Sequence, residues 1–214
     1  MHIAIEGMDG SGKTSTAKRV AKIMGYQFVE KPLHLITDQD NYFENYMEVI
    51  NRVNHMESRF RARFYGLGNY LVSSKAKAGN VVTDRHLVSN YYWNCAEDEE
   101  YFNWLVKECG IPDMTFILCV SATERRKRIA ERNPDDPDLN RNVFDDSCYE
   151  QMKSFLEKYQ MKYFFINSDN KGLDEVVQEI VEVINNHITL TNSDKAKSSI
   201  QISTKENNKD SEAT

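Results

Sequence analysis

One stretch near the N-terminus decides the fold of this chain: Ile3-Ala4-Ile5-Glu6-Gly7-Met8-Asp9-Gly10-Ser11-Gly12-Lys13-Thr14-Ser15-Thr16. A short apolar run is followed by a full match to the phosphate-binding loop pattern G-x-x-x-x-G-K-T. Glycines let successive backbone N–H groups point at phosphate oxygens, and the helix that starts after the loop adds its positive N-terminal end. The sequence therefore predicts nucleotide binding by the loop residues Gly7, Met8, Asp9, Gly10, Ser11, Gly12, Lys13, Thr14 and Ser15.

Three side chains are suited to a metal-bound triphosphate. A lysine in the position of Lys13 lies along the β- and γ-phosphates, and the hydroxyl of Thr14 can enter the octahedral shell of Mg²⁺. Asp84 ends a predicted strand beside that of the loop, where a carboxylate can hold Mg²⁺ through water. Capping the helix that starts near His86 is the alternative role for Asp84. We predict ATP and Mg²⁺ as ligands, with Lys13 catalytic and with Thr14 and Asp84 at the metal.

Length and composition limit the class of protein. A chain of 214 residues can form one buried α/β core, and a net charge of −6 argues against a nucleic-acid binder. The four cysteines include no C-x-x-C pair, which favours reduced thiols in the cytosol over a zinc site. We see no cationic leader and no stretch of membrane-spanning length. The expected protein is cytoplasmic, with a small-molecule partner and neither a nucleic-acid polymer nor a membrane.

Strand-like and helix-like segments alternate along the chain, which predicts a parallel sheet with helices on both faces. We expect a domain over residues 1–187 and a disordered polar tail over 188–214. The predicted strands are 2–6, 26–30, 80–83, 114–120 and 163–166. The predicted helical segments are 14–24, 41–77, 86–95, 97–109, 122–132, 142–160 and 173–186.

Two motifs at this spacing resemble the thymidylate kinase family over roughly residues 2–186. They are the loop Glu6–Thr14 with its Asp9, and Asp84-Arg85-His86 followed by Ser89. The resemblance implies the P-loop kinase fold, a three-layer sandwich with a five-stranded parallel sheet and an Arg-bearing lid. It also implies transfer of the ATP γ-phosphoryl group to dTMP or a related nucleoside monophosphate, and a homodimer formed through the helices before and after Asp84. The deoxynucleoside kinases share this fold and are the alternative.

The resemblance assigns roles to several arginines. Arg85 has a planar fork suited to phosphate and in the family contacts the transferred or acceptor phosphoryl group, whereas an ion pair with a neighbouring acid is the other reading. The arginine-rich segment 125–132 before an acidic loop resembles the family's lid. Helical spacing places Arg125 with the lid arginines but leaves Arg126 in solvent. The expected catalytic lid residues are Arg128, Arg132 and Arg141, with surface ion pairs as the alternative.

Residues 30–32 do not decide whether the phosphoryl acceptor is a nucleoside monophosphate or a nucleoside. Thymidylate kinases usually have Arg-Glu-Pro-Gly-Gly there, whereas this chain has Glu30-Lys31-Pro32 and no glycine pair. Deoxynucleoside kinases have a Glu at this strand end as the base for a 5′-hydroxyl, and Glu30 could act so. Lys31 could instead supply the missing cation, and Asp9 favours a thymidylate kinase.

Aromatic residues and arginines suggest where a base would bind. Arg59, Arg61 and Arg63 lie near the family's base-contacting arginine, and Arg63 precedes a stacking surface at Phe64-Tyr65. Residues 91–94 fall where the family lines its base pocket, although aromatic residues on a helix more often belong to the core. The predicted substrate-binding residues are Asp9, Glu30, Lys31, Arg63, Arg85, Tyr92 and Asn94.

Two other classes of protein are weighed. A GTP-dependent switch needs an N-K-x-D motif, which Asn170-Lys171-Gly172-Leu173-Asp174 misses by one residue. A non-catalytic nucleotide-binding relative would fit the altered residues 30–32, but the intact Lys13 and Arg85 argue against it. We therefore predict an ATP-dependent nucleotide or nucleoside kinase.

Overall fold

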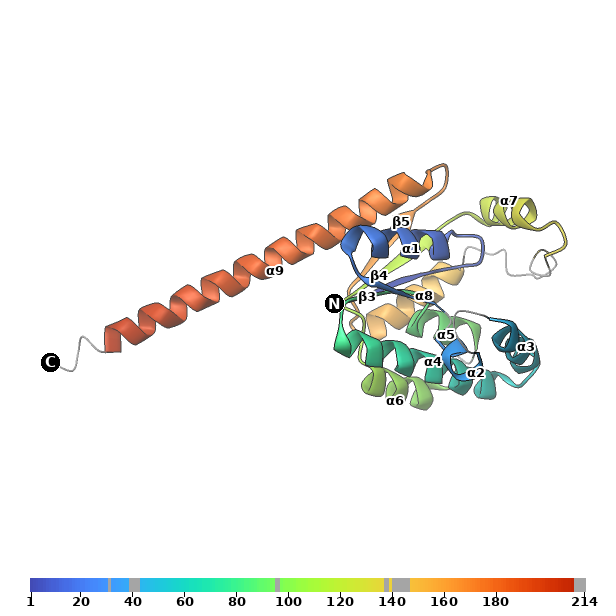
Figure 1. Cartoon of the computed structure of the whole chain (residues 1–214), viewed down its shortest axis with the longest axis horizontal. Helices are drawn as coiled ribbons and strands as arrows, with labels where there is room; N and C mark the ends of the chain where they lie inside the picture. The colour runs from blue at the N-terminus through green and yellow to red at the C-terminus, as the bar shows by residue number, and fades with distance from the viewer. Residues whose placement is uncertain (31, 39–42, 95–96, 137–138, 140–146, 210–214) are drawn as a thin grey trace.

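The computed structural model describes residues 1–30, 32–38, 43–94, 97–136, 139 and 147–209, with side chains up to residue 191. These residues form a five-stranded parallel sheet in the order β2-β3-β1-β4-β5 (Figure 1). The strands are β1 (His2–Gly7), β2 (Gln27–Val29), β3 (Val81–Asp84), β4 (Met114–Cys119) and β5 (Tyr163–Asn167). The predicted α/β class and parallel sheet are confirmed.

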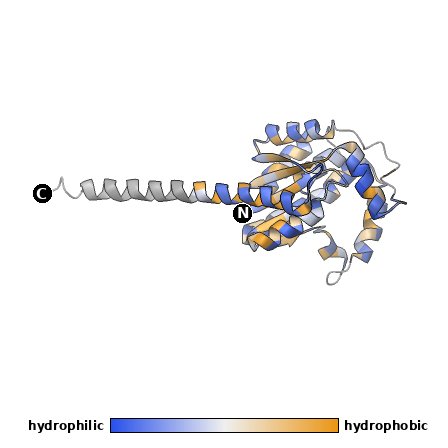
Figure 2. Ribbon diagram, turned by 90° about the horizontal axis from the view of Figure 1, so that it is seen from above, coloured by the Kyte–Doolittle hydropathy of each residue, from blue (hydrophilic) through white to orange (hydrophobic). Residues whose placement is uncertain are grey.

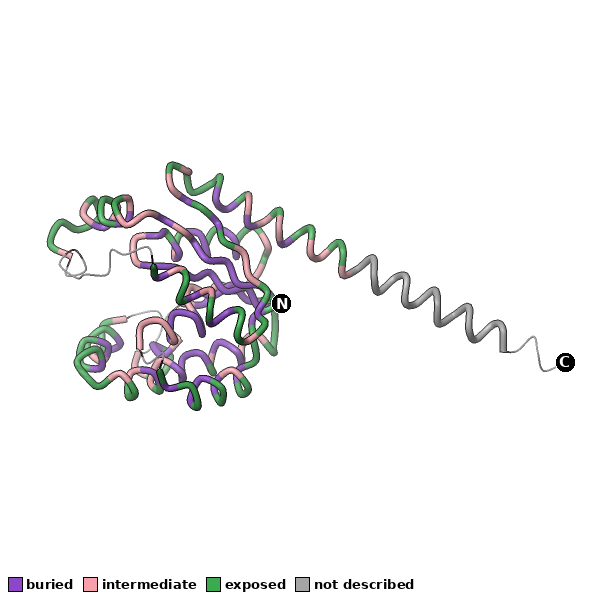
Figure 3. Tube along the Cα trace, turned by 180° about the vertical axis from the view of Figure 1, so that it is seen from behind, coloured by how far each residue is buried: buried purple, intermediate pink, exposed green. Residues whose placement is uncertain are grey.

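Helices cover both faces of this sheet and complete three layers. They are α1 (Lys13–Met24), α2 (His34–Thr37), α3 (Glu44–Val53), α4 (Ser58–Ala78), α5 (Leu87–Trp93), α6 (Glu99–Cys109), α7 (Ala122–Arg132), α8 (Cys148–Lys158) and α9 (Leu173–Lys209). On β4, Phe116 faces a core shared with α1 and α9, while the adjacent Ile117 faces a core shared with α5, α6 and α8. This alternation follows from the two-residue period of a strand. Buried residues accordingly lie along the strands and on the inward sides of the helices (Figure 3).

The C-terminal helix differs from the prediction. The sequence predicted a helix that ends at Asn186 and a disordered tail from residue 188, but α9 continues to Lys209 and extends away from the rest of the molecule (Figure 1). Apolar residues at helical spacing, such as Val176 and Ile180, occur in the part that packs on the sheet (Figure 2). Loss of this pattern signals the end of the core, but elongation of an existing helix needs no core beneath it. The domain boundary near residue 187 stays a prediction.

The sheet topology determines where a ligand can bind. β1 and β3 are neighbours, but α1 leaves β1 toward one face and α5 leaves β3 toward the other. Connections that diverge in this way open a crevice at the carboxyl ends of the strands. The register places Ile5 beside Asp84 and Gly7 beside Leu118, so that the loop after β1 and the Asp84-Arg85 turn meet at that crevice. No helix in the described part of the chain is both long and apolar enough to cross a membrane.

Candidate active site

The phosphate-binding loop connects β1 to α1 through three glycines with positive φ: Gly7 (136°), Gly10 (80°) and Gly12 (87°). These values lie where a side chain is disfavoured, so glycine is required for the path of the loop. A Cβ at Gly7 would lie 2.7 Å from the Leu118 carbonyl oxygen, whereas one at Gly12 would meet nothing within 4 Å. The loop therefore packs tightly on β4 and leaves its other side open, as a phosphate cradle requires. Met8 contributes only backbone there, because its side chain is fully buried in the core.

Lys13 is the first residue of α1 and its side chain is buried. Its Nζ donates to the Met8 carbonyl oxygen at 2.6 Å and lies 3.9 Å from Asp9 Oδ1. Burial, together with the Arg85 charge, lowers the pKa of the lysine to about 8. A phosphate group would restore the stabilisation of this charge, since an opposite charge within a few ångströms favours the ionised form.

Thr14 and Asp84 meet where the sequence predicts a metal. The Thr14 hydroxyl donates to Asp84 Oδ2, while Asp84 Oδ1 is buried and has no hydrogen-bond partner among the described residues. A hydroxyl beside an unpartnered carboxylate oxygen fits Mg²⁺, which takes oxygen ligands and usually keeps waters and substrate phosphates in its shell. The described residues contain no group of three or more His, Cys, Asp or Glu side chains that could hold a metal by themselves. These two residues thus suit a cation that is shared with a phosphate.

Arg85 and Asp9 form an ion pair between β3 and the loop. Arg85 has φ of 69° and about a third of its side chain is exposed. Burial raises the pKa of Asp9, but the charges of Arg85, Lys13 and Arg132 outweigh it and lower the pKa to about 2. The site therefore contains an ionised aspartate whose cationic partner has the fork geometry that binds phosphate.

A cavity of about 580 Å³ opens at this point, and we call it the strand-end cavity. Asp9, Thr14, Asp84 and Arg85 line its inner end. Its walls are one face of α3 with Tyr46, Met47 and Ile50, the cavity side of α4, and α5 with Ser89, Asn90, Trp93 and Asn94. Its volume and its mixture of apolar walls and a few charged groups are typical of a small-molecule site.

Four predicted substrate residues, Asp9, Glu30, Arg85 and Asn94, line the strand-end cavity. Glu30 is 19% exposed, with its Oε1 3.3 Å from Lys18 Nζ. Lys31 lies outside the described residues.

Two predicted substrate residues, Arg63 and Tyr92, do not line the strand-end cavity. Arg63 binds Asp98 at 3.0 Å and lies over the Tyr101 ring, whereas Arg61 lines the cavity. Arg61 lies on the same face of α4 as the cavity residues Tyr65, Gly68, Asn69 and Val72. Arg63 is two positions further along the helix and therefore points away from that face.

Trp93 rather than Tyr92 is the aromatic residue that lines the cavity from α5. Tyr92 packs against Trp93, with ring centroids 4.9 Å apart, and against the core. The indole Nε1 of Trp93 and the Nε of Arg61 are both buried without a hydrogen-bond partner among the described residues. Sequence reasoning weighed Arg61 beside Arg59 and Arg63, and Trp93 within residues 91–94, but selected neither for the substrate site. Each lies four residues from another cavity residue, Tyr65 and Ser89 respectively.

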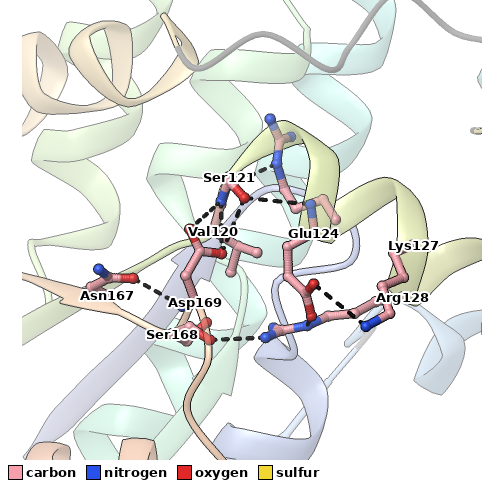
Figure 4. Close-up of polar contacts among 9 residues, drawn as sticks. Val120, Ser121, Glu124, Lys127, Arg128, Asn167, Ser168 and Asp169 are labelled. Atoms are coloured by element: carbon pink, nitrogen blue, oxygen red, sulfur yellow. Dashed lines mark hydrogen bonds and ion pairs between the residues drawn. The ribbon is translucent and has the colours of Figure 1, made fainter.

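Three of the four arginines of α7 make different contacts. Arg125 is buried and donates from Nε to the Val120 carbonyl at 3.1 Å. Arg128 donates to Glu124 at 2.9 Å and to the Ser168 carbonyl at 2.8 Å, and so joins α7 to the turn after β5 (Figure 4). Arg132 is 64% exposed and pairs with Asp136 at 2.7 Å.

Arg126 is exposed as expected, and Arg141 lies outside the described residues. Of the predicted lid arginines, the two that the structure describes, Arg128 and Arg132, make separate contacts, and the lid itself stays a prediction. The base of α7 nevertheless contacts the loop, since a Cβ at Gly10 would lie 2.8 Å from the Arg125 carbonyl oxygen.

A family model described as thymidylate kinase matches residues 5–180. The chain belongs to the thymidylate kinase family. The predicted recognition is thereby confirmed, and the family assignment identifies an ATP-dependent nucleotide kinase. A probable thymidylate kinase of Methanocaldococcus jannaschii is 25% identical over 209 residues, covering 87% of this chain and 96% of that protein. Another from Methanococcus aeolicus is 24% identical over 196 residues, covering 84% of this chain and 93% of that protein.

Solved structures of this family and of a neighbouring one share the fold. The thymidylate kinase from Ehrlichia chaffeensis superposes with a TM-score of 0.58 at 18% identity, covering 86% of this chain and 98% of that one. Deoxyadenosine kinase from M. mycoides with bound dCTP gives a TM-score of 0.56 at 19% identity, covering 87% of this chain and 100% of that one. The P-loop kinase fold is confirmed, and both kinds of kinase resemble the chain equally well in structure.

Proposed function

We propose that this protein transfers the γ-phosphoryl group of ATP to the phosphate of dTMP or a closely related deoxynucleoside monophosphate. The observation that carries the proposal is the Asp9–Arg85 ion pair, which joins the phosphate-binding loop to the strand-end cavity. The loop is suited to the triphosphate and the cavity to the acceptor. The ion pair lies between them, where the two phosphates would meet.

In this reaction an oxygen of the acceptor phosphate attacks the γ-phosphorus, and the bond to the β–γ bridging oxygen breaks to release ADP. Lys13 would exchange the Met8 carbonyl for the β- and γ-phosphate oxygens, and Arg85 would turn part of its fork from Asp9 to the transferred or acceptor group. Thr14 and Asp84 would hold Mg²⁺, which supplies positive charge at the β- and γ-oxygens when bound. The protein's contribution is positioning and charge stabilisation, because phosphoryl transfer needs little covalent help.

The lid arginines belong to this proposal. Arg132 is included because its charge is among those that lower the pKa of Asp9. Arg128 of α7, which bonds to the turn after β5, would act at the donor side. Arg141 is proposed from the family resemblance alone. Closure of such a lid would place cations on the developing charge and exclude water.

A deoxynucleoside kinase is the second candidate, and Glu30 is the observation that favours it. Its carboxylate lines the strand-end cavity, where it could accept the proton of a 5′-hydroxyl. Lys18 Nζ lies 3.3 Å from that carboxylate. A monophosphate acceptor instead needs cations, which Arg85 and the predicted Lys31 would provide.

An acceptor panel separates these candidates. Wild-type protein is incubated with Mg·ATP and with dTMP, thymidine or other deoxynucleosides and their monophosphates, and products are resolved by chromatography. The proposal predicts dTDP from dTMP, with Glu30→Gln retaining at least a third of the rate. Product from thymidine alone, lost in Glu30→Gln, would instead support the nucleoside kinase. A competition between ATP and GTP in the same assay tests the GTP-dependent alternative.

A homodimer is proposed through the helices on either side of Asp84. The supporting observation is that Phe60, Leu67 and Tyr70, three large side chains of the helix α4 that precedes Asp84, are exposed. Exposed apolar patches of this kind favour protein interfaces. Size-exclusion chromatography with light scattering should give a mass of two chains, and a monomer at working concentration would contradict the proposal. The expected cytoplasmic location stays a prediction.

A further inference from the structure

Glu6 is a buried carboxylate that the reaction above leaves without a role. It lies one residue before the end of β1, and none of its surface is exposed. One carboxylate oxygen accepts the backbone N–H of His86 at 2.7 Å, and the other accepts the hydroxyl of Ser89. Burying a carboxylate has a desolvation cost, which an apolar residue in the same place would avoid. Its partners indicate what the carboxylate does there.

Both partners belong to the turn that carries Arg85. Arg85 has φ of 69°, a left-handed conformation that residues other than glycine rarely adopt. On its N-terminal side the turn is held by the sheet, because the Arg85 N–H donates to the Ile5 carbonyl at 3.0 Å. On its C-terminal side the next N–H, that of His86, bonds to Glu6. Glu6 therefore supplies the hydrogen bond on the side of the strained turn where the backbone of β1 supplies none.

Ser89 provides a second path to the guanidinium. Its hydroxyl proton is directed at Glu6, which leaves an oxygen lone pair for another donor, and Arg85 Nη1 lies 3.5 Å from that oxygen. The other terminal nitrogen of Arg85 bonds to Asp9. The planar fork is thus held at both ends, by Asp9 directly and by Glu6 through Ser89.

We propose that Glu6 is a positioning residue for phosphoryl transfer, which fixes the backbone turn and the Ser89 hydroxyl so that the Arg85 fork faces the reacting phosphates. This inference rests on the proposed function. Glu6 touches neither nucleotide and acts only through Arg85. Because misplacement of a catalytic group by about 1 Å can lower a rate about 10²-fold, the effect should be large.

A double-mutant cycle tests the inference. Glu6→Gln keeps the shape of the side chain but removes its charge. Its amide nitrogen donates rather than accepts, so the Ser89 hydroxyl can no longer donate to it as it does to Glu6. We expect kcat to fall about 10²-fold in Glu6→Gln while the KM for ATP stays within about threefold. In an Arg85→Ala background, assayed by transfer of ³²P, the same change should lower kcat by less than about threefold. Equal losses in both backgrounds, or no loss in the first, would overturn the inference.

Two controls separate positioning from loss of stability. Ile117→Val removes a methyl group from a fully buried residue of β4 and should lower the melting temperature without changing kcat. Ser89→Ala removes the hydroxyl path and leaves the bond from His86 to Glu6, and it should give a smaller loss of kcat, about tenfold, that again vanishes beside Arg85→Ala. If Glu6→Gln fails to fold, Ser89→Ala decides the outcome, and an equal loss in both backgrounds would overturn the inference.

A readout independent of activity keeps this inference separate from the proposed function. The Nε–H resonance of Arg85 in ¹⁵N NMR spectra is assigned by its absence from Arg85→Ala. It should shift or broaden in Glu6→Gln and remain in place in Ile117→Val. An unchanged resonance in Glu6→Gln would overturn the inference even if the enzyme is active, whereas a kinase-inactive wild-type protein would refute only the proposed function.

Discussion

Replacing Gly10 by alanine should destabilise the protein more than the same replacement at Gly12, because only Gly10 lies against α7. Both residues have a positive φ, 80° and 87°, so that each alanine should cost roughly 1–2 kcal/mol in backbone strain. A Cβ at Gly10 would also lie 2.8 Å from the Arg125 carbonyl oxygen and 3.1 Å from Ile129 Cγ1, whereas at Gly12 it would meet nothing within 4 Å. Overpacking of this kind typically costs about 1–3 kcal/mol.

The matched pair therefore isolates the contact between the loop and α7. Urea unfolding of the ligand-free protein should show Gly10→Ala less stable than Gly12→Ala by about 1–3 kcal/mol. Gly10→Ala should also raise the KM for ATP. The added methyl group would meet the backbone of α7, and the phosphate-binding loop would have to shift to relieve that contact. Equal losses of stability in the two variants would refute the packing of α7 on the loop.

Three further outcomes follow from the geometry. Burial and the N-terminal charge lower the pKa of His2 from 6.5 to about 4. Between these two pH values His2 is protonated in the unfolded chain and neutral in the folded one. Stability should fall by about 3 kcal/mol across that range, and His2→Gln should flatten this part of a pH series of urea unfolding curves. Arg61→Ala should raise the KM for the acceptor at least tenfold in steady-state kinetics. The control Arg63→Ala should leave that KM unchanged. Asp84→Asn should increase at least about tenfold the Mg²⁺ concentration for half-maximal rate, and an unchanged Mg²⁺ titration would remove Asp84 from the metal site.

Much of the fold could be predicted because it rests on local patterns. The loop glycines need positive φ, and the apolar runs at 2–6 and 114–120 can be satisfied only in a buried strand. The helix predicted over 122–132 is α7 to the residue, because Ser121 caps its first turn and Pro134 follows its end. Such signals lie within a few residues of the element that they specify.

The misses have a different physical origin. Arg61 and Arg63 have the same chemistry, and only the packing of α4 against α6 decides which of them faces the strand-end cavity. The same holds for Tyr92 and Trp93 on α5. The end of α9 was misplaced because the composition of residues 188–209 indicates that no core lies beneath them but does not fix their backbone conformation. Contacts between elements distant in sequence decide these features.

The most direct test of the account is a single-turnover experiment with [γ-³²P]ATP, Mg²⁺ and dTMP, run on the wild type, Lys13→Ala and Arg85→Ala. The account predicts that the label appears in dTDP with the wild type, and that transfer falls at least about 10³-fold in both variants, which each lose a cation on the transferred group. Label transfer to dTMP at the wild-type rate in either variant, or none with the wild type under saturating ATP and dTMP, would contradict it.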